Sequence, residues 1–161
     1  MFRFRLLPFT FSLIAVCTTG ALAQTTPAPV NKNYDDSLAK KVGADDYGMR
    51  KYVLAILKTG PKDAEVQGDA RKALFKGHFD NMMRLEKEGK LAVAGPFNDP
   101  EKKYRGLFIL AVPTVEEAKA LAETDPTVKA GVLVVEYVPW YGSASLMLSG
   151  EFHDKVKKKD F

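Results

Sequence analysis

Apolar and polar residues change their period along the chain, and each change predicts a separate element. Residues 51–59 (KYVLAILKT) are nearly all apolar or suited to strands and are followed by Gly60 and Pro61, which predicts a central strand with both faces covered. Residues from about 64 or 68 to 88 instead follow the period of a helix, and Gly89 comes next, where a left-handed residue ends a helix most easily.

The predicted helix has one apolar face that carries a histidine. At about 100° per residue, Leu74, His78, Met82 and Leu85 fall on one stripe, so the imidazole of His78 points toward the core. The opposite stripe is charged apart from Met83 and includes an expected Asp80–Arg84 pair; its charged members are Lys72, Lys76, Asp80, Arg84 and Lys87. A buried imidazole must find a partner or stay neutral, because desolvating an unpaired charge costs on the order of several kcal/mol.

The remaining periodic segments complete a recognisable order of elements. Residues 91–97 and 104–112 predict two strands joined by a polar turn, and residues 129–138 predict a fourth strand. Residues 114–123 begin with the capping box of Thr114 and Glu117 and predict a second helix, while a short helix ended by Gly43 is expected over 34–42. The order β-α-β-β-α-β is that of an α+β, ferredoxin-like fold, a four-stranded antiparallel sheet with both helices on one face.

The first strand is apolar on both faces, although the helices cover only one of them. Its two sets of alternating residues are Val53, Ala55 and Leu57, and Tyr52, Leu54 and Ile56. A second copy of the chain is the simplest cover for the remaining face, so the sequence predicts a homodimer with its sheets face to face. The tail, residues 143–161, is expected to form a helix that packs Leu146, Met147, Leu148 and Phe152 and to end in a basic, solvated segment.

The N-terminus has the three parts of a secretory signal peptide. Two arginines precede a moderate apolar run and the small-residue pattern Ala21-Leu22-Ala23, which predicts cleavage after residue 23 and a periplasmic or secreted protein. Cleavage removes the only cysteine, Cys17, and leaves 22 basic against 20 acidic residues, so no charge argument for nucleic acid or for a membrane surface remains. Residues 24–49 are then a leader, residues 50–142 the main domain and residues 143–161 the tail.

Chemistry-bearing motifs are few. The chain has no G-x-S-x-G frame, no glycine-rich phosphate loop and no H-x-x-x-H pair, so neither a covalent nucleophile nor a metal site is predicted. Several residues at strand ends are candidates for binding a small-molecule ligand: Lys58 and Arg105 by charge, Trp140 and Tyr141 by stacking, and Gly95, Pro96 and Phe97 as a wall of the site. Turn formation, core packing and surface charge are the alternative roles of these residues.

Five segments together resemble the YciI-like, or YCII-related, family. They are RKYVLAILKTG, GHFDNMMRLEKEGKLAVAGPF, YRGLFIL, EEAKALAETDP and AGVLVVEYVPWYG, in this order between about residues 50 and 142. The resemblance implies a dimeric α/β barrel built from two ferredoxin-like subunits, and a site made of His78 and Asp125. Relatives of known activity act on small aromatic or quinone-like compounds. Read without the resemblance, Asp125 precedes Pro126 and is placed to cap a helix.

Two hypotheses of different class follow from these residues. In the first, Asp125 orients His78, which carries protons in an isomerisation or elimination on a small cyclic organic compound without a cofactor. In the second, the same fold binds a small ligand and catalyses nothing, with His78 satisfied inside the core. An oxygenase on the same barrel plan is a weaker third reading.

Overall fold

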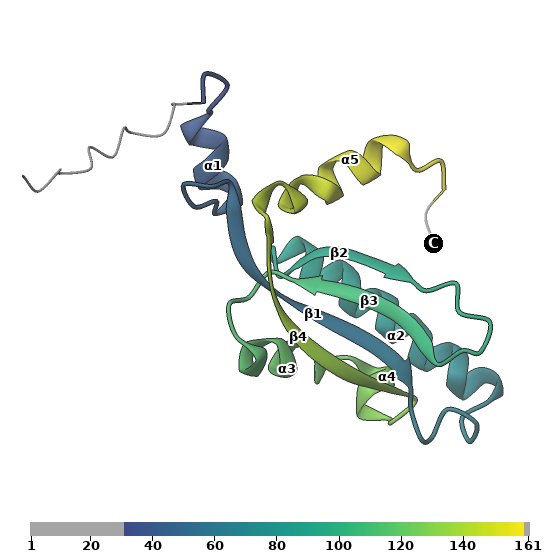
Figure 1. The fold of residues 1–161 in the computed structure, drawn as a ribbon. Coiled ribbons are helices and arrows are strands. Elements are labelled where there is room, and N and C mark those ends of the chain that lie inside the picture. Colours follow the sequence, from purple (N-terminus) through teal and green to yellow (C-terminus); the bar gives the residue numbers. More distant parts are fainter. Residues whose placement is uncertain (1–30, 160–161) are drawn as a thin grey trace, which may run out of the picture. The chain divides into compact units, whose positions relative to one another are not determined.

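Four antiparallel strands form the sheet of the structure, a computed structural model that describes residues 31–159 (Figure 1). The strands are β1 (Met49–Thr59), β2 (Leu91–Pro96), β3 (Tyr104–Leu110) and β4 (Leu133–Ser143), in the spatial order β2-β3-β1-β4. β1 pairs with both β3 and β4 and is therefore central, as its apolar run predicts. The predicted signal peptide, residues 1–23, lies outside the described residues.

Three helices connect the strands on one side of the sheet. They are α2 (Gly68–Lys87), between β1 and β2, and α3 (Val115–Ala122) with α4 (Pro126–Lys129), between β3 and β4 (Figure 1). Outside this set lie α1 (Asp36–Val42), the 3-10 turn η1 (Ala144–Leu148) and α5 (Ser149–Val156). The element order and the sheet order make an α+β structure consistent with a ferredoxin-like fold.

Several helix ends follow the predicted chemistry. The side chain of Asp35 caps α1, which ends at Gly43 with φ of 66°. Thr114 caps α3 through the backbone N–H of Glu117, as the capping box predicts. Gly89, with φ of 67°, follows α2 in the left-handed conformation that glycine adopts at low cost.

Two apolar clusters lie on opposite faces of the sheet. The larger one lies under α2 and α3 and includes Leu85, Phe108 and Leu110. The outer cluster consists of Tyr52, Ala92, Ile109 and Ala111, and Leu146 and Met147 of η1 pack against it. Beyond this cluster the outer face keeps exposed apolar side chains, among them Val134, Val138 and Trp140. Helices therefore cover much of one face of the sheet, while the tail covers part of the other.

Three sequence predictions are wrong in detail. Residues 129–132 are not part of a strand. Pro126 starts α4, which extends to Lys129, and β4 spans only Leu133–Ser143. Asp80 pairs with Lys76 rather than with Arg84, whose Nη1 instead donates to both carboxylate oxygens of Glu88. Phe152 is 58% exposed on α5 and therefore adds little to the core.

Within residues 31–159, no helix has both the length and the apolar character needed to span a bilayer.

Leu110 should carry a large share of the packing energy, since its side chain is fully buried beneath the helices. We expect Leu110→Ala to lower the free energy of unfolding by about 2–5 kcal/mol, because it removes buried methyl groups and leaves a cavity. Urea denaturation measures this change. The matched control is Leu38→Ala on α1, where the side chain is 42% exposed and the loss should be much smaller. Equal losses in the two variants would contradict the assigned core.

Candidate functional site

The side chains of His78 and Asp125 meet between α2 and α4. Nδ1 of His78 lies 2.6 Å from Oδ2 of Asp125, although the two residues are 47 positions apart in the chain. His78 is 7% exposed and Asp125 is 0% exposed. At this distance the imidazole Nδ1–H donates to an ionised carboxylate, which is a charge-assisted hydrogen bond.

Asp125 also caps α4 with its other carboxylate oxygen. Oδ1 accepts from the backbone N–H of Thr127 at 2.8 Å and from the Thr127 hydroxyl at 2.6 Å. Pro126 occupies the first turn, where a missing N–H costs nothing. The N-cap role expected from the sequence is confirmed, and the two oxygens of one carboxylate make both sets of contacts.

A glycine lets α2 approach α4 closely. A Cβ atom placed on Gly77 would lie 2.9 Å from Cγ of Pro126, closer than side-chain packing tolerates. Gly77 directly precedes His78, and Pro126 directly follows Asp125. The absence of a side chain at residue 77 therefore helps to bring the imidazole within hydrogen-bond reach of the carboxylate.

The carboxyl group of Asp125 is ionised because of its partners. Burial by itself raises the pKa of this carboxyl, but the hydrogen bonds from His78 and Thr127 favour the charged form more strongly and hold the pKa below its ordinary value. The site thus contains a fixed negative charge facing Nδ1 of His78.

Three phenylalanine rings surround the imidazole. Phe108 of β3 stacks on it with centroids 5.6 Å apart and 24° between the planes. Phe75 and Phe79, from the same helix, meet it edge-on at 5.9 Å and 5.5 Å. These rings exclude water from most of the imidazole and fix its orientation.

A second polar group lies on the buried side of α2, one turn beyond His78. Nη2 of Arg84 donates to Oδ1 of Asn81 at 2.8 Å and lies 3.0 Å from the hydroxyl of Thr124. The amide nitrogen of Asn81 is buried and finds no hydrogen-bond partner within the described part of the chain. This contact joins α2 to the segment that leads into Asp125.

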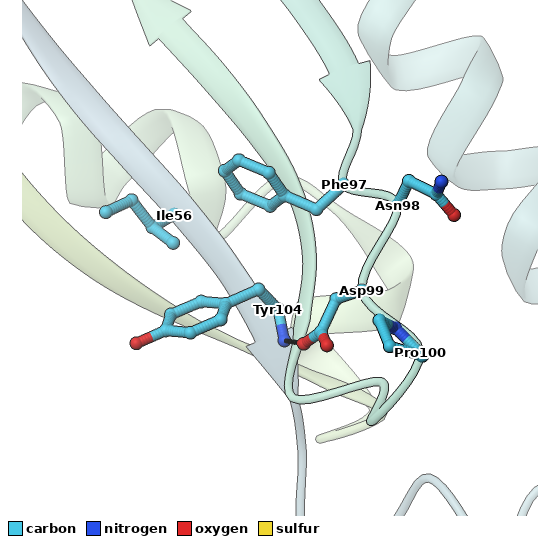
Figure 2. A pocket seen from close by; sticks show the side chains of 6 residues that line it. All are labelled: Ile56, Phe97, Asn98, Asp99, Pro100 and Tyr104. Atoms are coloured by element: carbon cyan, nitrogen blue, oxygen red, sulfur yellow. Dashed lines mark hydrogen bonds between the residues drawn. The ribbon is translucent and has the colours of Figure 1, made fainter.

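Three of the predicted ligand-binding residues, Lys58, Phe97 and Trp140, lie on the opposite, outer face of the sheet. Phe97 lines an open cavity of about 540 Å³ together with Ile56 and Tyr104 (Figure 2). Lys58, on the same face, pairs with Glu136 at 3.1 Å and lies over the ring of Tyr104. The sheet therefore separates Lys58 and Phe97 from His78.

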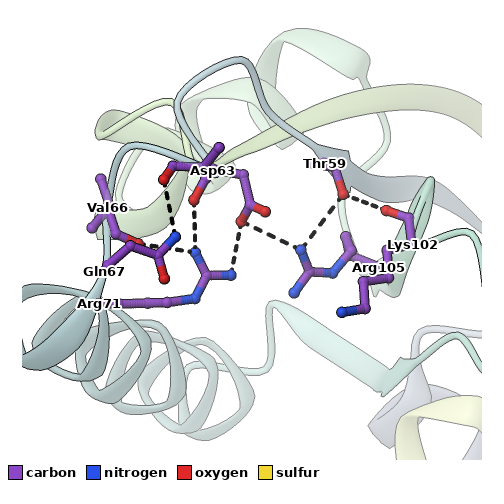
Figure 3. A network of polar contacts seen from close by, with 8 residues as sticks. Thr59, Asp63, Val66, Gln67, Arg71, Lys102 and Arg105 are labelled. Carbon is purple, nitrogen blue, oxygen red and sulfur yellow. Dashed lines mark hydrogen bonds and ion pairs between the residues drawn. The ribbon is translucent and has the colours of Figure 1, made fainter.

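Arg105 faces the helix side because of a β-bulge. The register between β1 and β3 slips between Leu57 and Lys58, so Arg105 has no opposite residue. Its guanidinium lies 3.4 Å from the carboxylate of Asp63, which also accepts from Arg71 at 2.8 Å (Figure 3). Both predicted basic residues, Lys58 and Arg105, thus already face a carboxylate.

The other predicted wall and stacking residues are dispersed. Gly95 and Pro96 lie at the exposed end of β2, and Pro96 pairs with Gly106. Trp140 packs on Tyr52 with ring centroids 5.7 Å apart, and the hydroxyl of Tyr141 donates to the carboxylate of Asp45. No contact joins these four residues to the His78–Asp125 pair among the interactions of residues 31–159.

Sequence reasoning missed Thr127 and the aromatic enclosure. Thr127 is the second residue after the N-cap Asp125, so a contact between the two was predictable from the sequence. Phe75 and Phe79 flank His78 at helix spacings i−3 and i+1, but only the tertiary packing brings Phe108 onto the imidazole. No group of three or more potential metal-binding side chains occurs within the described range.

Asp125→Asn should make the fold less sensitive to acid. The unfolded carboxyl has the higher, ordinary pKa, so the stabilisation by ionised Asp125 is complete above about pH 5 and is lost as the pH falls through the lowered pKa of the folded state. Below about pH 4 we therefore expect the free energy of unfolding to fall more steeply in the wild type than in Asp125→Asn, measured by urea denaturation at a series of pH values. Asp69→Asn, whose side chain is 96% exposed, should parallel the wild type. Equal slopes for the wild type and Asp125→Asn would refute the argument.

Comparisons with known proteins place the chain in a family. No curated protein matches the chain. Among solved structures, the chain is similar to 5-chloro-2-hydroxyhydroquinone dehydrochlorinase (TftG) from Burkholderia phenoliruptrix AC1100, in complex with 2,5-dihydroxybenzoquinone. The identity is 20%, over 55% of this chain and 90% of that chain, with a TM-score of 0.40. The family model of the YCII-related domain matches residues 52–141, more than half of the chain. The resemblance found in the sequence is thus confirmed, and the chain belongs to the YCII-related family.

Proposed function

We propose that the chain is an exported enzyme that uses His78 as a general acid and base and Asp125 as its orienting carboxylate. The observation that carries the proposal is the buried 2.6 Å contact between Nδ1 of His78 and Oδ2 of Asp125. Because Nδ1 donates to the carboxylate, the neutral imidazole carries its proton on Nδ1 and presents a lone pair at Nε2. Nε2 is then the atom that takes a proton from the substrate and returns it.

The chemistry that suits this pair is proton transfer on a small cyclic organic compound. In an isomerisation or elimination, Nε2 removes a proton beside a carbonyl or from a phenol, and the substrate itself delocalises the electron pair. The negative charge on Asp125 stabilises the imidazolium that forms. No cofactor is needed in this scheme, and the Phe75, Phe79 and Phe108 rings keep bulk water away from the proton in transit.

The enclosure of His78 favours a second candidate, a binding module without catalysis. The imidazole is 7% exposed, and neither the cavity at Phe97 nor a groove between α2, β2 and α5 is lined by His78 or Asp125. A histidine in that setting orders a core as readily as it transfers protons. The two candidates differ in whether a compound that binds the protein is also converted.

Turnover by histidine variants separates the two candidates. A panel of hydroxylated aromatic compounds and cyclic enones, screened first by thermal shift, is followed by NMR for conversion. We expect His78→Gln to lower kcat at least about 100-fold, since general acid–base groups contribute on this scale. Lys76→Gln is the control, because Lys76 lies exposed on the charged side of the same helix, α2, and lines neither cavity. Full turnover by His78→Gln would eliminate the proposed role.

The same proposal includes a homodimer joined through the outer face of the sheet. Val134 and Val138 are 40% and 39% exposed there, and Leu54 and Ile56 of β1 are only half-buried. A second subunit that packs on these residues removes apolar surface from water.

Sedimentation should find a dimer at micromolar concentration, and Val138→Asp should shift it toward the monomer. A carboxylate at residue 138 would be desolvated in the interface without a partner, which is costly. Val156→Asp, at a 76% exposed position of α5, should sediment as the wild type does. A wild-type monomer at this concentration would rule out the proposed dimer.

A further inference from the structure

A groove outside the His78–Asp125 pair lies between α2, β2 and α5. Its volume is about 560 Å³, within the range of small-molecule sites. The base of the groove comes from Phe79, Met82 and Met83 on α2, and α5 forms the facing wall with Gly150 and His153. The family match ends at residue 141, so α5 lies outside the matched domain.

The lining of the groove is apolar at its base and balanced in charge at its rim. Met83 and Phe79 are 61% and 43% exposed, and thioether side chains adapt to flat ligands of different outline. Two acids, Glu86 and Asp154, and two lysines, Lys87 and Lys157, lie around the base. Asp154 and Lys157 already pair with each other at 2.7 Å. Such a rim adds little binding free energy for a ligand with a net charge, whereas the apolar base favours binding of a flat uncharged molecule.

One side chain belongs both to the groove and to the enclosure of His78. The ring of Phe79 lies 5.5 Å from the imidazole with 70° between the planes, and it also lines the groove. Side chains with this much exposure change rotamer rapidly, on a timescale of about picoseconds to nanoseconds. A rotation of Phe79 away from His78 would therefore open a route from the groove to the imidazole.

We propose that the groove between α2, β2 and α5 binds an uncharged organic molecule of one or two rings, and that Phe79 is the gate between this molecule and His78. The proposal deepens the proposed function and rests on it for the consequence of opening the gate. Binding in the groove is itself independent of any reaction at His78.

Methionine methyl groups report binding directly. Of the methionines in residues 31–159, Met82 and Met83 line the groove, while Met49 lies on β1 and Met147 packs on the outer face of the sheet. The protein is labelled with [¹³C-methyl]methionine and titrated with 2-naphthol as the probe. We expect the NMR signals of the Met82 and Met83 methyl groups to shift in a saturable way, and those of Met49 and Met147 to keep their chemical shifts. Unmoved Met82 and Met83 signals, or a larger shift at Met147, would overturn the site.

Substitutions give the binding test a matched pair. Met83→Lys places a charge on the apolar base at an exposed position, and we expect it to raise the Kd for 2-naphthol at least tenfold, followed at Met82. Phe152→Ala changes an exposed apolar residue of α5 that does not line the groove, and the Kd of this variant should equal that of the wild type. Equal Kd values in the two variants would overturn the proposal.

The gate is tested without turnover. The chain has two histidines, so diethyl pyrocarbonate labelling at His78 and His153 is separated by mass. We expect Phe79→Ala to raise the labelling rate of His78 at least tenfold, and saturating 2-naphthol to slow the labelling of His78 again. An unchanged rate at His78 would overturn the gate. If His78→Gln keeps turnover while 2-naphthol still shifts Met82, the proposed function fails and the groove stands.

Discussion

The structure depends on how one buried carboxylate is satisfied. Asp125 is fully removed from solvent, and an unpaired charge in that position would cost several kcal/mol, on the order expected for a desolvated ion. Thr127 satisfies one oxygen and His78 the other. Each partner belongs to a different helix, so the same charge starts α4 and holds α2 against it. The geometry of the pair is therefore a requirement of the fold as well as of any chemistry.

This double role explains the residues around the pair. Gly77 and Pro126 allow the two helices to approach, and the phenylalanine rings replace the water that the imidazole gives up. The enclosure strengthens the hydrogen bond to Asp125, since the electrostatic interaction is stronger in a medium of low polarity. It also limits access to Nε2. The pair therefore combines a well-oriented imidazole with restricted entry, and an enclosing side chain must move before another molecule can contact Nε2.

Much of the fold was predictable from local patterns. Helix caps at Asp35 and Thr114 and the stop at Gly89 were readable because each depends on neighbours within a few residues. The start of β4 was not predictable in this way, since Pro126–Lys129 form a helix of only four residues, too short to show a periodic pattern. The partner of Asp80 was predicted wrongly because Lys76 and Arg84 both lie four residues from it. Arg84 instead donates to Asn81 and Glu88, which leaves Lys76 as the partner of Asp80.

The site was predictable in part. The period of α2 indicates that His78 faces inward, and the family resemblance points to Asp125. The inward turn of Arg105 was not readable, because it depends on a bulge that exists only once β1 and β3 pair. The positions of Lys58 and Phe97 on the far face have the same origin, since the side to which a strand residue points depends on the register of the sheet.

The family domain and the folding unit of this chain do not have the same end. Leu146 and Met147 lie beyond residue 141, yet they cover Tyr52, Ala92, Ile109 and Ala111. A shortened protein that stops where the family match stops would present these four side chains to water and would tend to aggregate through them. The unit suitable for expression and crystallisation therefore extends at least through η1.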